Sequence, residues 1–358
     1  NSKYWGYNNM TKKRDYSMDL LKFLASFGVV MIHVDANFRQ GEFVKNTTAW
    51  DLSLAINLLT KWCIPIFIMI SGYYLLNSSK EIDYNTFLKK RFKKVLLPFI
   101  VWSIIYNLYY QYISSGISIK WTALGLIKNI LGYPTAAPLW FLYPLLGLYL
   151  MMPIFKGIVD KIDFKIIAII IGFSIVIKTI SPFTDMVLNG SMNYWNDVPI
   201  ASSTFAIYFI LGGYLGRINI PKNLRALLYV LTAIVFIGGF VATYKVPFIY
   251  DRSLEVTLDI GAINNMLLCI SLFVMAQNMK FKKLSNSSIF TGFVGILSTV
   301  NFGVFLFHPI IIDLVKSKFL GISGNLIWIL LAQGIIVYVV TSIVVYIMKK
   351  IPLVKEIV

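Results

Sequence analysis

The chain has 358 residues, of which 58% are hydrophobic and 14% charged. Soluble domains carry about 25% charged residues, so this composition excludes an ordinary soluble globular protein and indicates a membrane protein. The formal net charge of +17 would suggest a nucleic-acid partner in a soluble chain, but the basic residues lie in short segments between apolar stretches. That placement is typical of a membrane topology signal, and we find no nucleic-acid-binding module.

The chain contains two cysteines, Cys63 and Cys269, each inside an apolar segment, and two histidines. We therefore expect neither a disulfide framework nor a metal site. Residues 1–13 are polar and aromatic, unlike a cleavable signal peptide, so the first apolar segment is expected to act as a signal anchor.

Apolar segments follow one another along the whole chain, and we interpret ten of them as membrane spans. Each has about 15–25 residues, close to the roughly 20 that a helix needs to cross the hydrocarbon core. The sequence therefore predicts an all-α, polytopic membrane protein that forms one domain over residues 1–358, without an internal repeat or an appended soluble domain. The predicted spans are residues 16–37, 52–76, 95–113, 139–155, 164–180, 201–215, 224–244, 262–277, 300–314 and 326–348.

The lysines and arginines predict the orientation of these spans. If the N-terminus is cytoplasmic, about two thirds of the 33 basic residues fall in cytoplasmic segments, as the positive-inside rule requires. Both ends of the chain are then inside. The densest basic run, residues 89–94, would lie at the cytoplasmic face, where contact with lipid headgroups alone is one explanation for it.

Two of the predicted outer segments are long, residues 111–138 and 181–200. The first contains an apolar stretch with two lysines, residues 117–133. Such a stretch predicts an interfacial or re-entrant helix beside a cavity.

The first span carries an unusual set of polar side chains. Lys22 and His33 are eleven residues apart, which is 20° past three full helical turns, so they share one face about 16–17 Å apart along the axis. Asp19, Ser26 and Asn37 extend the same stripe. Since an ionisable group costs a few kcal/mol within a membrane, we expect this stripe to face a cavity.

Two structural explanations remain open for the stripe: a buried hydrogen-bond network, or Lys22 extending its ammonium group to the inner membrane surface. The functional explanation concerns His33, because imidazole titrates near neutrality and is a natural general base for a hydroxyl nucleophile.

Several short motifs occur in order along the spans. The first is the basic residue and histidine at Lys22 and His33. The others are Ser71-Gly72 late in the second span, Arg91-Phe-Lys-Lys94 followed by Pro98, Trp140-Phe-Leu with Tyr149 and Pro153, and Phe307-His308-Pro309. In this order the chain resembles the acyltransferase-3 family of bacterial membrane acyltransferases. It looks most similar to the stand-alone O-acetyltransferases of the type that modifies enterobacterial common antigen.

The resemblance implies an acyl donor, most simply acetyl-CoA, bound from the cytoplasm. Arg91 and Lys94 would hold the CoA phosphates, or would serve as a topology signal alone. Ser71 and Gly72 would let the pantetheine arm approach the backbone, unless their small size serves ordinary helix packing. Lys94 stands where the family's motif has a second arginine.

In the implied mechanism, His33 is the general base for an acceptor hydroxyl that arrives from the outer side. Lys22 would orient the donor or stabilise a developing charge. It stands where the family more often has arginine, so the cation is kept but the bidentate fork is lost.

Besides Asp19, Ser26 and Asn37, further residues are candidates for acceptor or support roles. Trp140, Tyr143 and Tyr149 would form a sugar-stacking wall, or would be ordinary interfacial aromatic residues. His308 would be a second acid–base group or a buried core histidine. The carboxylate that would pair with His33 is not determined by the sequence, where Asp185, Asp259 and Asp313 are all candidates.

The function that we predict is therefore transfer of an acyl group, acetyl or succinyl, from CoA to a hydroxyl of an envelope glycan or lipid-linked sugar. The protein would be a multi-pass protein of the bacterial inner membrane. Two alternatives remain: a transporter or flippase for a polar lipid or sugar, and an amino-acid sensing or uptake domain like those fused to racemases. A transporter usually shows paired halves, which we do not detect.

Overall fold

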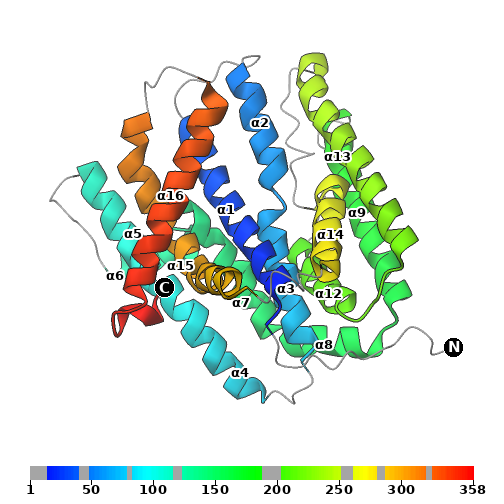
Figure 1. Cartoon of the computed structure of the whole chain (residues 1–358), viewed down its shortest axis with the longest axis horizontal. Helices are drawn as coiled ribbons and strands as arrows, with labels where there is room; N and C mark the ends of the chain where they lie inside the picture. The colour runs from blue at the N-terminus through cyan, green and yellow to red at the C-terminus, as the bar shows by residue number, and fades with distance from the viewer. Residues whose placement is uncertain are drawn as a thin grey trace. The chain divides into compact units, whose positions relative to one another are not determined.

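A computed structural model of the chain describes residues 14–39, 48–78, 83–115, 123–187, 203–250, 261–279, 287–319 and 325–358. Within these ranges the regular elements are all helices (Figure 1). In chain order they are α1 (Tyr16–Arg39), α2 (Thr48–Thr60), α3 (Cys63–Leu76), α4 (Tyr84–Arg91), the π-helical η1 (Phe92–Leu96), α5 (Leu97–Ser115), α6 (Ala123–Gly132), the 3₁₀ turn η2 (Ala137–Phe141), α7 (Leu142–Leu150), α8 (Met152–Lys161), α9 (Phe164–Val187), α12 (Thr204–Leu215), α13 (Lys222–Tyr250), α14 (Ile263–Asn278), α15 (Ser288–Phe319), α16 (Leu326–Met348) and the 3₁₀ turn η5 (Val354–Glu356).

All ten apolar segments predicted from the sequence fall on helices, which confirms the all-α, multi-pass membrane fold. Helices are favoured because a chain in lipid must satisfy its backbone hydrogen bonds within the segment itself. In the described ranges, six helical stretches are long and apolar enough to cross a membrane, and a pair bent by 60° makes a seventh if it is one span. The six are Tyr16–Ala36, Asp51–Leu76, Tyr84–Ile113, Lys222–Ala242, Ser288–Phe319 and Leu326–Met348. The count of ten and the orientation stay predictions.

Two predicted spans are interrupted, each just before a proline. Residues 52–76 form α2 and α3 with a turn at Lys61 and Trp62, and Pro65 then lies in the first turn of α3. The span at residues 139–155 bends by 60° between Leu150 and Met152, and Pro153 lies in the first turn of α8. Proline has no N–H group to donate to the preceding turn, so it begins a helix more easily than it continues one.

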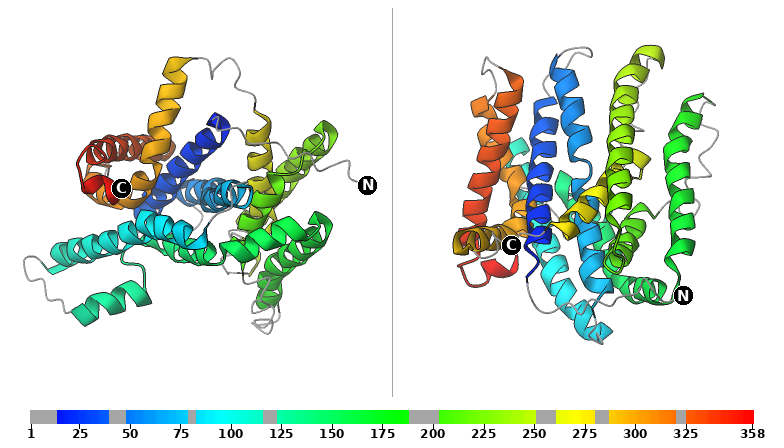
Figure 2. Two further views of the ribbon diagram at one scale, coloured as in Figure 1. Left: turned by 90° about the horizontal axis from the view of Figure 1, so that it is seen from below. Right: turned by 45° about the vertical axis from the view of Figure 1, so that its right-hand side comes forward.

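The helices form two compact units, which are described separately. The first unit contains Asn1–Ser79 and Ile154–Val294. In it α1 lies beside α2 and α3, α3 crosses α12, and α13 runs beside α14 (Figures 1 and 2). Its core is apolar, with Met18, Ile66 and Phe209 fully buried.

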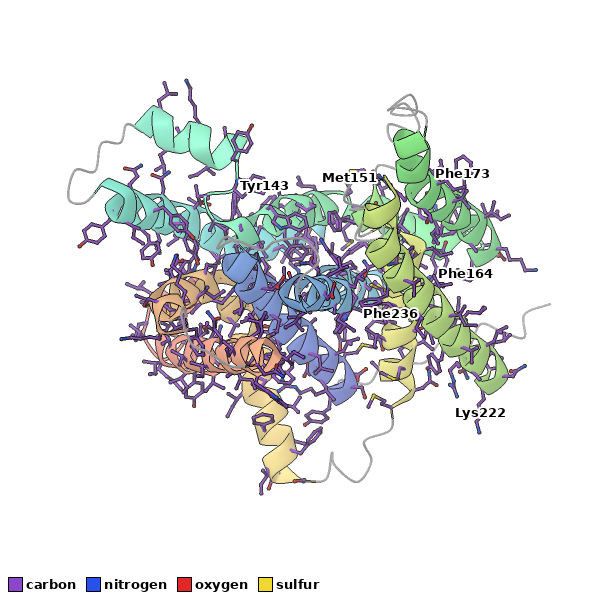
Figure 3. The ribbon with its side chains drawn as sticks, turned by 90° about the horizontal axis from the view of Figure 1, so that it is seen from above. Tyr143, Met151, Phe164, Phe173, Lys222 and Phe236 are labelled. Atoms are coloured by element: carbon purple, nitrogen blue, oxygen red, sulfur yellow. The ribbon has the colours of Figure 1, made fainter. Side chains whose placement is uncertain are left out.

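Helix α13 of the first unit is apolar and almost entirely exposed. Only 6% of its most apolar stretch, within Lys222–Ala242, is buried. In Figure 3, Phe173 of α9 points away from the neighbouring helices and Lys222 marks the start of α13. A surface this apolar is expected for a helix whose solvent is hydrocarbon.

The second unit contains Lys80–Pro153 and Gly295–Val358. Here α4, η1 and α5 run on without a break from Tyr84, and α7 packs against α4 and η1. The indole nitrogen of Trp102 donates to the carbonyl of Ile357 at 2.7 Å, and the hydroxyl of Tyr106 donates to the carbonyl of Leu306 at 2.6 Å. These bonds fix α5 against α15 and the segment after α16.

The stretch at residues 117–133, predicted as an interfacial or re-entrant helix, contains α6. Residues 116–122 lie outside the described ranges. Leu124, Ile127 and Leu131 of α6 are more than half exposed. The position of α6 relative to a membrane remains a prediction.

Candidate active site

The polar stripe of α1 begins with a carboxylate shared by two cations. Asp19 is buried, and its two oxygens accept from Arg14 Nε at 2.5 Å and from Lys22 Nζ at 3.3 Å. The Lys22 ammonium also lies 5.0 Å from the centre of the Tyr74 ring on α3. Because Asp19 is three residues before Lys22, it lies one turn away on the same face, where such pairs meet.

These contacts hold the Lys22 ammonium in one place within an apolar helix. A carboxylate and an aromatic face both stabilise a cation that has lost water. Two positive charges share one negative charge, so the cluster keeps a net charge of about +1. The cluster can therefore still attract an anionic group, while the cost of burying Lys22 is partly offset.

Ser26 and His33 lie further along the same helix. Ser26 is 2% exposed, and within the described ranges its hydroxyl has no hydrogen-bond partner. His33 is partly buried. Asn37 belongs to α1, but its side chain lies outside the described residues. A buried hydroxyl between the cation and the imidazole gives the stripe a polar group with unused bonding capacity.

Asp35 is a buried carboxylate whose importance the sequence did not reveal. It is 1% exposed, and it accepts from the Ser53 hydroxyl at 3.0 Å and from the Asn57 amide at 3.2 Å, both on α2. Two residues, or about 200° of helix turn, separate Asp35 from His33, so the two side chains leave α1 in different directions. The only signal in the sequence is an acidic residue within an apolar span.

The carboxylates that the sequence offered as partners of His33 are placed differently. Asp313 on α15 accepts from Lys316 at 3.0 Å, as an i,i+3 pair. The side chain of Asp185 and the whole of residue 259 lie outside the described ranges.

The Ser71-Gly72 motif lies on α3, where the helix meets α12. A Cβ atom built at Gly72 would be 1.9 Å from the carbonyl oxygen of Phe209. The space that a missing side chain leaves at Gly72 is thus filled by the backbone of α12, as in small-residue helix packing. Ser71, the neighbouring residue, is partly exposed.

In the second unit, Arg91 ends α4 between two aromatic rings. Its guanidinium carbon lies 5.5 Å from the centre of the Phe87 ring and 5.4 Å from that of Tyr149. The hydroxyl of Tyr84 donates to the carbonyl of Leu150 at 2.5 Å, which joins α4 to α7. Contacts of this kind stabilise a cation near an aromatic face, and the fork of N–H groups on an arginine suits an anion.

Lys94 follows one turn later, in η1. It is exposed and has no ion pair in the described part of the chain, whereas the adjacent Lys93 lies 3.4 Å from Glu356. The π-helical turn shifts the residues that follow relative to α4. Arg91 and Lys94 therefore form a cationic pair on one continuous helical segment.

The remaining sequence candidates also belong to the second unit. The Tyr149 ring packs edge-on against Phe87 at 6.1 Å and is close to Arg91. Trp140 is partly buried and contacts Phe141. His308 is fully buried, and its Nδ1 lies 2.9 Å from the carbonyl of Val304. Because a carbonyl oxygen only accepts, that contact requires a proton on Nδ1.

The structure thus brings together Asp19 and Lys22 in the first unit, and Arg91 and Tyr149 in the second. Among the described residues, no three His, Cys, Asp or Glu side chains gather in a way that would hold a metal ion.

A family model described as an acyltransferase domain matches residues 15–350. The chain is also similar to the succinoglycan biosynthesis protein ExoH of Rhizobium meliloti (strain 1021), with 27% identity over 158 residues. This stretch is 40% of the chain and 43% of the relative, so the chain spans less than half the length of that curated protein. No solved structure matches the chain.

Proposed function

Since the chain belongs to the acyltransferase-3 family, we propose that it is a membrane O-acyltransferase of the bacterial inner membrane. It takes an acyl group, acetyl in this proposal, from cytoplasmic acyl-CoA. The acceptor is a hydroxyl of an extracytoplasmic glycan or a lipid-linked sugar, a substrate class suggested by the name of the relative that takes part in succinoglycan biosynthesis.

The observation that supports this proposal best is the Lys22 cluster within a membrane helix. An ammonium within an apolar helix, here held by Asp19 and the Tyr74 ring, is costly in lipid, and such groups are retained where they serve function. His33 lies on the same helical face, about 16–17 Å further along the axis.

This separation assigns different tasks to the two residues in the proposed reaction. Lys22 is too far from His33 along the helix to reach the same atoms. In the proposal it orients the pantetheine arm of the acyl-CoA donor. His33 takes the proton of the acceptor hydroxyl, whose oxygen attacks the thioester carbonyl carbon. The C–S bond breaks, an ester forms, and CoA leaves as a thiolate that is then protonated.

Arg91 and Lys94 are the proposed anchors for the phosphates of CoA. Arginine suits this task because its guanidinium offers N–H groups in a fixed fork, and here the rings of Phe87 and Tyr149 lie close to it. Ser71 remains a candidate for contact with the pantetheine arm. We assign Gly72 to the packing of α3 on α12.

The first test is acetyl-CoA binding to the purified protein in detergent. We expect the double variant Arg91→Ala/Lys94→Ala to bind at least about ten-fold more weakly, because two charged contacts to phosphate are lost. Lys350→Ala is the matched control. Like Arg91, Lys350 is a cation of the second unit close to an aromatic ring, in its case that of Tyr346. Absence of binding to a folded wild-type protein would favour the transporter or sensing alternative.

The second test separates chemistry from binding. We expect His33→Ala to lose acyl transfer by a factor of about 100 or more, since general base catalysis contributes 10²–10⁴-fold. Acetyl-CoA binding and membrane insertion should be retained. Full transfer activity in His33→Ala would overturn the assignment of the base.

A further inference from the structure

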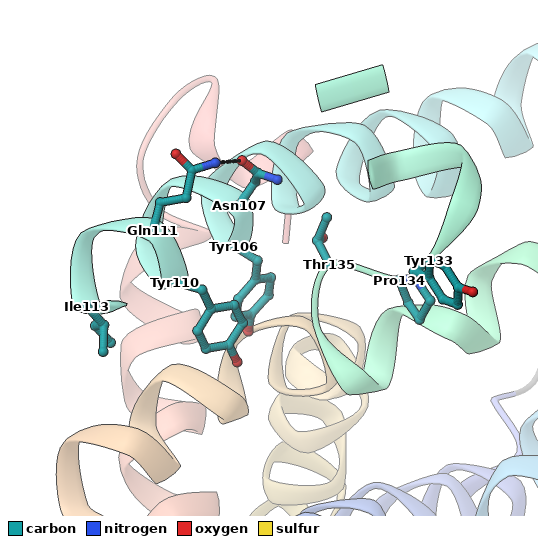
Figure 4. Close-up of a pocket in the computed structure, with 8 residues that line it drawn as sticks. All are labelled: Tyr106, Asn107, Tyr110, Gln111, Ile113, Tyr133, Pro134 and Thr135. Carbon is teal, nitrogen blue, oxygen red and sulfur yellow. Dashed lines mark hydrogen bonds between the residues drawn. The ribbon is translucent and has the colours of Figure 1, made fainter. Parts of the chain in front are cut away.

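The second unit contains a cavity of about 550 Å³ at the C-terminal end of α5. Figure 4 shows that its walls come from two segments, the last turns of α5 and the stretch that follows α6. The volume falls within the roughly 300–1,000 Å³ of typical small-molecule sites. Its principal lining residues are Tyr106, Asn107, Tyr110, Gln111, Tyr133 and Thr135.

The α5 wall is a fixed aromatic surface. The rings of Tyr106 and Tyr110 stack at 5.8 Å with an angle of 22° between them. Tyr106 is fully buried and donates to the carbonyl of Leu306 at 2.6 Å, which prevents it from turning. Tyr110 is 37% exposed, so one part of the stack is accessible to a ligand. Stacking on the fixed Tyr106 ring limits the motion of the Tyr110 ring, which lowers the side-chain entropy that a ligand would have to remove.

Two amides extend this wall. Gln111 Nε2 donates to Asn107 Oδ1 at 2.7 Å, which fixes the orientation of both groups. The amide nitrogen of Asn107 then points away from Gln111, towards the side of the cavity where Thr135 lies (Figure 4). Asn107 is buried, so a donor at this position is held in place for a ligand oxygen.

The opposite wall follows α6. The Thr135 hydroxyl is buried and, within the described ranges, has no hydrogen-bond partner. Tyr133 is 83% exposed. The hydroxyl of Tyr143 on α7 donates to the carbonyl of Ile130, which fixes the end of α6 from which this wall extends. A buried hydroxyl without a partner is costly unless a ligand or water completes its bonding.

The chemistry of this lining is specific. None of the lining residues carries a formal charge: they provide aromatic faces, amides and a hydroxyl together with Pro134 and Ile113. Phosphate and carboxylate ligands would need cations here, and a lipid chain would need a wholly apolar wall. Aromatic faces beside amides and hydroxyls suit a neutral sugar, whose C–H face packs on a ring while its hydroxyls exchange hydrogen bonds.

The position of the cavity agrees with an acceptor site. Arg91 and Asn107 lie on one helical stretch, Tyr84–Ile113, and sixteen residues separate them. At 1.5 Å per residue this is about 24 Å, most of the roughly 30 Å of a hydrocarbon core. The cationic pair and the neutral cavity are thus separated along one helical stretch by most of the depth of a hydrocarbon core, which is the separation expected of a donor site and an acceptor site on opposite sides of a membrane.

From these observations we propose that this cavity binds a neutral pyranose unit of the acceptor glycan. Tyr110 is the stacking face, and Asn107 and Thr135 are the hydrogen-bonding groups. The proposal rests on the function proposed above, since an acceptor site exists only in a protein that transfers an acyl group.

The test measures binding of neutral oligosaccharides to the purified wild-type protein by saturation-transfer NMR, with cellotetraose and galactotetraose as probes. We expect binding of at least one probe, and a loss of ten-fold or more in affinity in Tyr110→Ala and in Asn107→Ala. Tyr112→Ala is the control, because Tyr112 is an exposed tyrosine of the same helix that does not line the cavity. Binding of neither probe, or equal binding by all the variants, would overturn the proposal.

Acetyl-CoA binding is measured on the same samples, so that the two proposals fail separately. If acetyl-CoA binds and both oligosaccharides do not, the acceptor site is wrong and the transferase proposal stands. If an oligosaccharide binds at Tyr110 but acetyl-CoA does not bind the protein, the cavity is a sugar site. Its role as an acceptor site is then overturned together with the transferase proposal. Retention of acetyl-CoA binding in Tyr110→Ala and Asn107→Ala shows that these variants are folded.

Discussion

Gly72 of α3 and Gly212 of α12 face each other's helix backbone at a single crossing. A Cβ atom at Gly72 would lie 1.9 Å from the carbonyl oxygen of Phe209, and a Cβ atom at Gly212 would lie 1.9 Å from that of Met69. The two contacts are reciprocal, because the backbone of each helix occupies the space that a side chain would take at the glycine of the other helix. In lipid, where water does not drive apolar surfaces together, this close approach is a principal source of helix association.

We predict that Gly72→Ala lowers the apparent melting temperature in detergent, with a loss of about 1–3 kcal/mol, because the obstructing atoms are backbone and cannot turn away. Gly172→Ala on α9 is the control. A Cβ atom there has no neighbour within 4 Å, so alanine should be neutral or slightly stabilising through its helix propensity. Equal melting temperatures for wild type and Gly72→Ala would contradict a close approach of the α12 backbone to Gly72.

Arg217 joins three helices at one end of the first unit. Its guanidinium donates to the carbonyls of Leu76 and Val159, both at 2.8 Å, and to Asp160 Oδ1 at 2.5 Å. Its Nε also donates to Asn77 Oδ1 at 2.7 Å. Leu76, Val159 and Asp160 lie in the last turns of α3 and α8, and Asn77 directly follows α3, so the side chain satisfies carbonyls that the ends of two helices leave open.

Replacement of Arg217 by methionine should destabilise the protein by about 2–3 kcal/mol, since charged hydrogen bonds are lost and carbonyl groups are left without a donor. Arg217→Lys should recover only part of this, because an ammonium cannot reproduce the planar fork. The check is the rate of thermal inactivation in detergent. Arg225→Met, which loses one contact with the side chain of Asn278, should differ little from wild type.

Asp19 is predicted to position Lys22 for the proposed reaction. Asp19→Asn keeps the shape of the side chain but removes the charge that holds Lys22 at 3.3 Å. We expect the rate of acyl transfer at saturating donor to fall roughly ten-fold or more, because misplacing a positioned group raises the barrier. Arg14→Ala, which leaves the Asp19–Lys22 pair in place, should retain most of the activity. A wild-type rate in Asp19→Asn would exclude this role.

Tyr149 is predicted to act through Arg91, whose guanidinium lies 5.4 Å from its ring. In Tyr149→Leu the apolar volume is nearly kept, but the cation–π contact of about 0.5–1 kcal/mol is lost. The dissociation constant for acetyl-CoA should therefore rise about two- to five-fold. In the Arg91→Ala background the same substitution should have no further effect. An equal rise in both backgrounds would contradict coupling between the two residues.

Sequence reasoning recovered the helices because their signal is local. A run of about 20 apolar residues is long enough to cross a bilayer, and within lipid the chain can then only be helical. The same reasoning placed Lys22 and His33 on one face, since the helical repeat fixes that relation without any tertiary information. It did not place the turn before α3, inside the apolar stretch Asp51–Leu76, or the 60° bend before α8, near Pro65 and Pro153 respectively.

The amino-acid sequence by itself thus determined the all-α membrane fold, the polar stripe of α1 and the basic run that includes Arg91. Only the tertiary structure showed that Asp35 is held by Ser53 and Asn57, that Tyr149 lies against Arg91, and that a neutral cavity forms at the end of α5. The physical reason is that hydrophobic length and helical periodicity are properties of neighbouring residues. The partner of a buried charge is set by which helices pack together, and no local pattern encodes that choice.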